Sequence, residues 1–136
     1  MHSLGKCLTV LVVDDEAGFR NLLKWELGNT GMTVETAENG VQGLAMTKSK
    51  HFDVVVTDVT MPEMDGLKFL ESIKKTSPET QVILVTGFGA VETAVYAMQK
   101  GARDFLLKPY DIQYLINCIN KVSKEITSCL LCGRKE

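Results

Sequence analysis

Three acidic side chains stand directly after two short apolar runs in this sequence. Asp14 and Asp15 follow residues 8–13, and Asp58 follows residues 54–57. In open parallel sheets, sites form at the edge where the strands end. Carboxylates gathered there repel one another unless a cation is present, and Mg²⁺ binds through one or two carboxylates plus other oxygens. A lone Asp after a strand is more often a helix cap, but three such residues favour a metal site.

A hydroxyl and an ammonium group end two further apolar runs. Thr86 follows residues 82–85, and Lys108 follows residues 105–107. Lys108 would place a point cation on a phosphate oxygen, and the Thr86 hydroxyl would donate to another. A carboxylate such as Asp58 can attack phosphorus and form an aspartyl phosphate. These residue types together therefore suit a phosphoryl group and a divalent cation.

Alternating strands and helices must position these groups. Four apolar runs and the short segment 33–37 predict five strands, and stripes at helical spacing predict a helix after each. Right-handed crossovers then give an α/β fold: a doubly wound, flavodoxin-like, five-stranded parallel sheet of order 2-1-3-4-5. Asp14 and Asp15 would face Asp58 across the point where the strand order reverses. The predicted strands are 8–13, 33–37, 53–57, 81–85 and 104–107.

Helical periodicity also predicts which side chains enter the core. Asp111 is the expected N-cap of the last helix, and the helical pattern fades after residue 125. The predicted core stripe of the first helix is Phe19, Leu22, Leu23 and Leu27, and that of the fourth is Val91, Ala94, Val95 and Met98.

Composition narrows the class of protein. With 136 residues and 45% hydrophobic residues, one domain with an ordinary core is expected. The net charge of −2 argues against a direct nucleic-acid binder. No apolar run approaches the roughly 20 residues of a membrane span, and no signal peptide is evident, so a cytoplasmic protein without membrane contact is expected.

Cys129 and Cys132 form a CxxC pair near the end of the sequence. They could belong to a tail or linker, to a metal site completed elsewhere, or to a redox pair. Zinc needs about four ligands, and the two histidines lie far away in sequence. A tail or linker is the favoured interpretation, and residues 126–136 are assigned to it.

Residues 6–125 resemble the receiver domain of two-component response regulators. The resemblance rests on the order and spacing of residues 12–16, 57–66, 85–87 and 105–109. It implies a phosphorelay function: transfer from a phosphohistidine onto Asp58, with self-catalysed dephosphorylation and no other enzymatic activity. Asp14, Asp15, Asp58 and the main-chain oxygen of Thr60 would hold Mg²⁺, which Mn²⁺ is expected to replace.

The resemblance also implies a switch and a gate for water. Thr86 and Lys108 would bind phosphoryl oxygens, and Thr86 with Phe105 would form the switch. Phe105 stands where many receivers carry Tyr, so a switch that needs a hydroxyl is in question, and constant burial of Phe105 is the alternative. Thr60, Gly87 and Phe88 would lie beside the phosphate.

Partners follow from the same resemblance. A sensor histidine kinase or phosphotransfer protein would dock on the first helix, with Trp25 as an anchor, although single exposed apolar residues are normal. A homodimer through the fourth helix, fifth strand and last helix is possible. The 86–90 and 101–110 segments look most like receivers of nitrogen-regulator-type transcription factors, implying a downstream ATPase or DNA-binding module. The expected kinase contacts are Gly18, Asn21, Trp25 and Pro109.

Other functions are less well matched. A phosphatase of the haloacid dehalogenase class would need a second acid two residues after Asp58, where Thr60 stands. A flavodoxin-like nucleotide domain would need a phosphate-binding loop after the first strand, where Asp14 and Asp15 would repel the phosphate. An interaction domain that is never phosphorylated would have no use for the complete acceptor set.

Overall fold

The protein is described by a computed structural model that covers residues 8–61, 64–87 and 91–131, with side chains apart from those of residues 91 and 126–131. Five strands form one parallel sheet of order β2-β1-β3-β4-β5, as predicted. No described helix is long and apolar enough to cross a membrane. The strands are β1 Thr9–Val13, β2 Thr33–Ala37, β3 Val54–Asp58, β4 Gln81–Thr86 and β5 Asp104–Leu107.

A helix follows each strand. Asn39 and Asp65 cap α2 and α3 through side-chain oxygens that accept from backbone N–H groups. The Asp111 Oδ1 atom accepts from the Gln113 N–H at 2.9 Å, which confirms the predicted cap of α5. The helices are α1 Ala17–Gly28, α2 Gly40–Ser49, α3 Gly66–Thr76, α4 Val91–Gln99 and α5 Ile112–Leu131.

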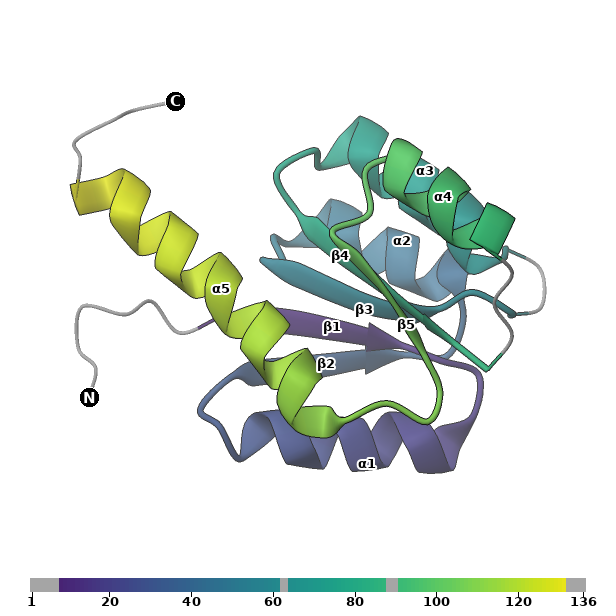
Figure 1. Cartoon of the computed structure of the whole chain (residues 1–136), viewed down its shortest axis with the longest axis horizontal. Helices are drawn as coiled ribbons and strands as arrows, with labels where there is room; N and C mark the ends of the chain where they lie inside the picture. Colours follow the sequence, from purple (N-terminus) through teal and green to yellow (C-terminus); the bar gives the residue numbers. More distant parts are fainter. Residues whose placement is uncertain (1–7, 62–63, 88–90, 132–136) are drawn as a thin grey trace.

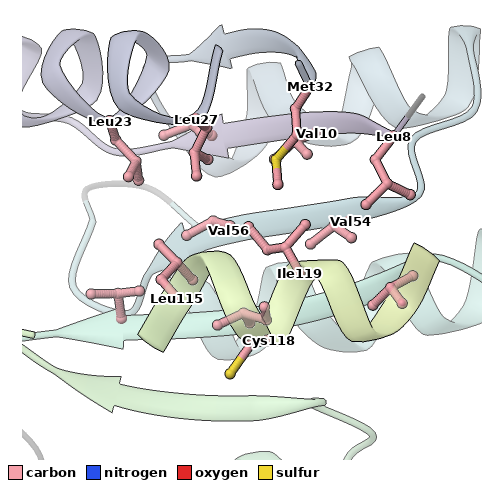
Figure 2. Close-up of a cluster of buried hydrophobic side chains, with 14 of the residues drawn as sticks. Leu8, Val10, Leu23, Leu27, Met32, Val54, Val56, Leu115, Cys118 and Ile119 are labelled. Carbon is pink, nitrogen blue, oxygen red and sulfur yellow. The ribbon is translucent and has the colours of Figure 1, made fainter. Parts of the chain in front are cut away.

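The helices cover the two faces of the sheet as a doubly wound fold requires. In Figure 1, α1 and α5 lie on one face, and α2, α3 and α4 lie on the other. Figure 2 shows the first core layer, where Leu23 and Leu27 of α1 and Leu115 and Ile119 of α5 approach side chains such as Val56. Alternate strand residues thus point to opposite layers.

The second layer lies between the sheet and the helices α2, α3 and α4. Phe69, Leu70 and Ile73 of α3 are fully buried there, together with Ala97 of α4. Burial of large aliphatic and aromatic side chains stabilises a fold by about 1.5–3 kcal/mol each. Both faces of the sheet are therefore covered, which explains why β1, β3 and β4 read as continuous apolar runs.

Three side chains of the predicted core stripes lie at the surface instead. Leu22 is 53% exposed, Val95 48% and Met98 47%. In α1, Leu23 and Leu27 face the sheet, so the adjacent Leu22 points away from it. In α4, the small Ala97 is fully buried in the second core layer. Periodicity identified an apolar stripe on each helix but placed part of it on the wrong side.

The α5 helix continues to Leu131, beyond the point at which the helical pattern fades. The boundary at residue 125 therefore does not coincide with the end of secondary structure. Cys129 and Cys132 lie outside the described side chains, so their role stays a prediction. The assignment of residues 126–136 to a tail or linker likewise stays a prediction.

Candidate functional site

Asp14, Asp15 and Asp58 meet at the carboxyl edge of the sheet. Parallel pairing puts Val13 of β1 beside Thr57 of β3, so the residues that follow these two are neighbours. One carboxylate oxygen from each Asp lies within 4.8 Å of the others. The predicted convergence of the three acidic side chains is confirmed.

Asp14 is the buried member of this cluster. Only 2% of it is exposed, and its Oδ1 accepts from the Glu16 N–H at 2.9 Å. Burial raises the pKa of its carboxyl, while the Glu16 hydrogen bond and the Lys108 charge oppose that rise. The Asp58 charge adds to it. The ionised form of Asp14 is therefore disfavoured even with the Lys108 ammonium beside it.

Asp58 is the last residue of β3 and is held at both carboxylate oxygens. Its Oδ1 accepts from the Thr60 N–H at 3.0 Å, and its Oδ2 accepts from Lys108 Nζ at 3.1 Å. The Asp58 carbonyl is packed against Gly66, where a Cβ would lie only 2.3 Å from the carbonyl oxygen. The backbone that carries the carboxylate is thus tightly supported by the start of α3.

Lys108 joins the two carboxylates that come from different strands. Its Nζ lies 3.3 Å from Asp14 Oδ2 and 3.1 Å from Asp58 Oδ2. Burial alone would lower the pKa of Lys108, but the hydrogen bond to Asp58 and the charges of Asp14 and Asp58 raise it overall. The ammonium therefore stays charged and supplies a fixed cation at this edge.

Thr86 lies at the same edge as the last residue of β4. It is buried, with 1% exposure, and its carbonyl accepts from the Lys108 N–H at 2.8 Å. Asp58 pairs with Val85, so Thr86 follows one residue beyond the Asp58 partner. The hydroxyl and the ammonium predicted from sequence thus come from adjacent strand ends.

The predicted switch and gate residues occupy different environments. Phe105 on β5 is half-buried and packs against the second core layer, so it faces inward. Thr60 and Gly87 are exposed beside the carboxylate edge, and no described atom would contact a Cβ at Gly87 within 4 Å. Phe88 lies outside the described residues, so its role stays a prediction.

The expected kinase-contact residues are exposed. Gly18, Asn21 and Trp25 lie on the outer side of α1, with Trp25 65% exposed, and Pro109 is exposed in the loop after β5. An open groove of about 510 Å³ runs between α1 and that loop. Its lining residues are Phe19, Leu22, Glu26, Lys108, Pro109, Tyr110 and Ile112.

Sequence reasoning missed the groove and the role of its side chains. The helical stripe predicts a core position for Phe19 and Leu22, and Tyr110 carries no predicted role. The groove depends on where the loop after β5 crosses α1, which no local pattern encodes. The available signal was the step of three residues from Phe19 to Leu22, which also fits an apolar stripe at a helix edge.

The carboxylate cluster fits a divalent cation. Asp14, Asp15 and Asp58 are hard oxygen ligands, and Mg²⁺ typically takes one or two carboxylates and keeps waters for the rest of its shell. Burial raises the pKa of Asp14, and a bound divalent cation would oppose this rise because it favours the ionised carboxylate. Asp15 and Asp58 are accessible enough to receive an ion, since Asp15 is exposed and Asp58 half-buried.

Comparison with known proteins gives one consistent family. The family model described as the response regulator receiver domain matches residues 10–120 of this chain. The transcriptional regulatory protein ZraR of Klebsiella oxytoca is 40% identical over 111 residues, covering 82% of this chain and 25% of that protein. The DNA-binding transcriptional regulator NtrC of Escherichia coli K12 is 40% identical over 112 residues, covering 82% and 24%. The chain therefore spans about a quarter of the length of these relatives.

Solved structures agree with this match. A response regulator receiver domain protein from Clostridium thermocellum superposes with a TM-score of 0.82 at 36% identity, covering 87% of this chain and 95% of the other. The beryllofluoride-activated NtrC4 receiver domain dimer superposes with a TM-score of 0.81 at 39% identity, covering 86% and 97%.

Proposed function

Because this chain belongs to the response regulator receiver domain family, whose members serve phosphorylation signalling, we propose that Asp58 is its phosphoryl acceptor. One observation carries the proposal: Lys108 Nζ bridges Asp58 and Asp14 at 3.1 and 3.3 Å within a cluster of three carboxylates. An acceptor carboxylate, a cation for the phosphoryl oxygens and ligands for a metal ion thus stand together.

The chemistry follows from these positions. An Asp58 carboxylate oxygen forms the new bond to phosphorus while the bond from phosphorus to the donor imidazole nitrogen breaks. The leaving nitrogen keeps the electron pair. Lys108 and the Thr86 hydroxyl bind phosphoryl oxygens, and the Thr60 N–H holds the Asp58 carboxylate in place.

A divalent cation completes the proposed site. Asp14, Asp15, Asp58 and the main-chain oxygen of Thr60 would hold Mg²⁺. When bound, it would offset negative charge on the transferring phosphoryl group. Asp15 is the proposed direct ligand, because it is exposed while Asp14 is already engaged by the Glu16 N–H and Lys108.

Intact-mass measurement with Mg²⁺ and a small phosphodonor such as acetyl phosphate tests the acceptor. The wild type should gain one base-labile phosphoryl group, and Asp58→Asn should gain none. Asp65→Asn is the matched control, since Asn caps a helix as well as Asp and Asp65 caps α3. A phosphoryl group retained by Asp58→Asn would refute the assignment.

The proposed donor is a sensor histidine kinase or phosphotransfer protein that docks on α1 and the loop after β5. Gly18, Asn21 and Trp25 supply the helix side of this surface, and Pro109 supplies the loop side. Trp is enriched among binding hot spots, and Trp25 is 65% exposed on α1.

Transfer kinetics separate this docking role from simple surface exposure. Trp25→Ala should slow transfer from the cognate kinase about tenfold, typical of losing one anchor, and leave phosphorylation by acetyl phosphate unchanged. Equal slowing with both donors would mean that Trp25 supports folding. No slowing with either donor would show that Trp25 is not part of the docking surface.

We propose that phosphorylation alters the surface formed by α4, β5 and α5. Thr86 and Phe105 link the site to this surface, because Thr86 ends β4 and pairs with Leu107 of β5. Exposed apolar side chains make it suitable for a second copy of the chain. They are Val95, Met98, Leu107 and Tyr114.

The proposed output lies in a longer transcriptional regulator. The named relatives are transcriptional regulators of which this chain matches about a quarter. DNA binding, and any ATPase activity, would then belong to parts of the protein outside this region. Expression of the full gene product and sequencing of its remainder would test this directly.

A further inference from the structure

Phe19 lies beneath the ammonium group of Lys108. The Nζ atom is 4.0 Å from the centroid of the Phe19 ring, inside the roughly 6 Å over which a ring face attracts a cation. The same Nζ reaches Asp58 at 3.1 Å and Asp14 at 3.3 Å. The ammonium is therefore held between two carboxylates and an aromatic face, and only 22% of the Lys108 side chain is exposed.

Tyr110 makes a second contact with the Phe19 ring. The two rings meet at 87° with their centroids 6.0 Å apart, an arrangement that aromatic pairs prefer. Lys108 and Tyr110 belong to one loop and are separated by Pro109, so both contacts join this loop to Phe19 of α1. Phe19 also packs against the first core layer, which contains Leu23. The ring is thus anchored to both the helix and the loop.

We propose that Phe19 is a positioning residue for phosphoryl transfer, because its ring face keeps the Lys108 ammonium at the edge where Asp58 accepts the phosphoryl group. The inference rests on the proposed roles of Asp58 and Lys108. A free lysine side chain has many rotamers, and ordering it costs conformational entropy. Because the ring contact already orders the Lys108 side chain, part of this entropy is lost before the phosphodonor binds.

The ring contact also survives the exchange of partners that the reaction requires. During transfer the ammonium exchanges the Asp58 carboxylate for a phosphoryl oxygen. The attraction between the ammonium and the Phe19 ring does not depend on whether the other partner of the ammonium is a carboxylate or a phosphoryl oxygen. It therefore persists through this exchange. Loss of the ring face should therefore slow the transfer itself, whichever donor supplies the phosphoryl group.

Four variants test this with acetyl phosphate as donor, Mg²⁺ present and intact mass followed over time. Phe19→Leu should slow phosphorylation about threefold to tenfold, the range expected for one partly desolvated cation–π contact. Phe19→Tyr should keep most of the rate, because it keeps the ring face. Phe52→Leu is the matched control: Phe52 is a buried ring at the opposite edge of the sheet with Lys50 5.4 Å from its centroid. Phe19→Met replaces Phe19→Leu if the latter does not fold in thermal denaturation.

A Lys108→Met background separates positioning from general damage. If Phe19 acts through Lys108, Phe19→Leu should change the rate less than about twofold in this background, since coupled groups are non-additive. Equal slowing in both backgrounds, or slowing of Phe19→Tyr as severe as that of Phe19→Leu, would overturn the proposal. If Lys108→Met alone leaves the rate unchanged, the proposed role of Lys108 fails first. If Lys108→Met slows transfer but Phe19→Leu does not, only the role of Phe19 fails.

Discussion

At the residue scale, Asp14 carries an electrostatic cost because its carboxyl is buried. It is 2% exposed, and burial raises the pKa of its carboxyl above the ordinary value of 3.8. The folded state therefore favours the neutral carboxyl. Ionisation of Asp14 destabilises the metal-free fold at every pH above the raised pKa, and that cost disappears as the pH falls towards 3.8.

Asp14→Asn should accordingly raise the free energy of unfolding in EDTA at pH 7 by roughly 1 kcal/mol, a usual size for one substitution. The difference in the free energy of unfolding between the variant and the wild type should shrink as the pH falls through the raised pKa of Asp14. Urea denaturation at a series of pH values measures it. A gap that widens on acidification would contradict the stated cause, and Mg²⁺ should favour the wild type over the variant.

The sequence predicted these residues but not their individual environments. Asp14 and Asp15 are adjacent and both follow β1, so position alone gave no reason to separate them. In the structure Asp14 points inward to the Glu16 N–H and Lys108, whereas Asp15 is exposed. Successive side chains at a strand end point in opposite directions, but which of the two points inward depends on the tertiary packing.

At the element scale, the start of α3 supports the acceptor strand at close quarters. A Cβ at Gly66 would lie 2.3 Å from the Asp58 carbonyl oxygen and 2.8 Å from the Val59 Cα. Both of these are backbone atoms and cannot rotate away. The Gly66 N–H also donates to the Val59 carbonyl at 2.8 Å. Any larger residue must push α3 away from β3.

Gly66→Ala should therefore lower the free energy of unfolding by about 1–3 kcal/mol, the cost of forced overpacking, and slow phosphorylation of Asp58. Gly28→Ala in α1 is the control, because a Cβ there meets nothing within 4 Å. That control should change stability by no more than about 1 kcal/mol, and in the stabilising direction. Urea denaturation of both variants decides it, and equal stability changes would contradict the close packing.

Strands were more predictable than helix faces. Each predicted strand lies within a residue of its observed bounds. For β1, β3 and β4 the reason is that β-branched runs buried on both faces allow few other structures. For α4 the apolar period was visible, but Ala97 rather than Val95 or Met98 faces the sheet. A stripe of apolar side chains does not distinguish a core from an interface, since both need the same residues.

At the scale of the whole molecule, the surface of α4, β5 and α5 should control association. Val95 is 48% exposed on α4, whereas Val41 is 50% exposed on α2. With Mg²⁺ and beryllofluoride the wild type should form dimers, and Val95→Glu should weaken dimerisation about tenfold or more by burying an unpaired charge. Val41→Glu should dimerise like the wild type. Sedimentation analysis decides it, and equal loss in both variants would exclude this surface.

The strand order and the carboxylate edge were predicted from topology, because right-handed crossovers leave few alternatives for five βα units. The groove between α1 and the loop after β5 was not. It arises where Lys108 and Tyr110 contact Phe19, which joins segments about ninety residues apart in sequence. Local periodicity carries no information about such a crossing.

The most direct test of the central claim is to locate the phosphoryl group chemically. Borohydride reduces an aspartyl phosphate to homoserine, and peptide mapping by tandem mass spectrometry then identifies the converted residue. After treatment with acetyl phosphate and Mg²⁺, homoserine should stand at position 58 and Asp15 should remain unchanged. Homoserine at Asp14, Asp15 or Asp65, or no conversion in protein that has gained a phosphoryl group, would contradict the assignment of Asp58 as acceptor.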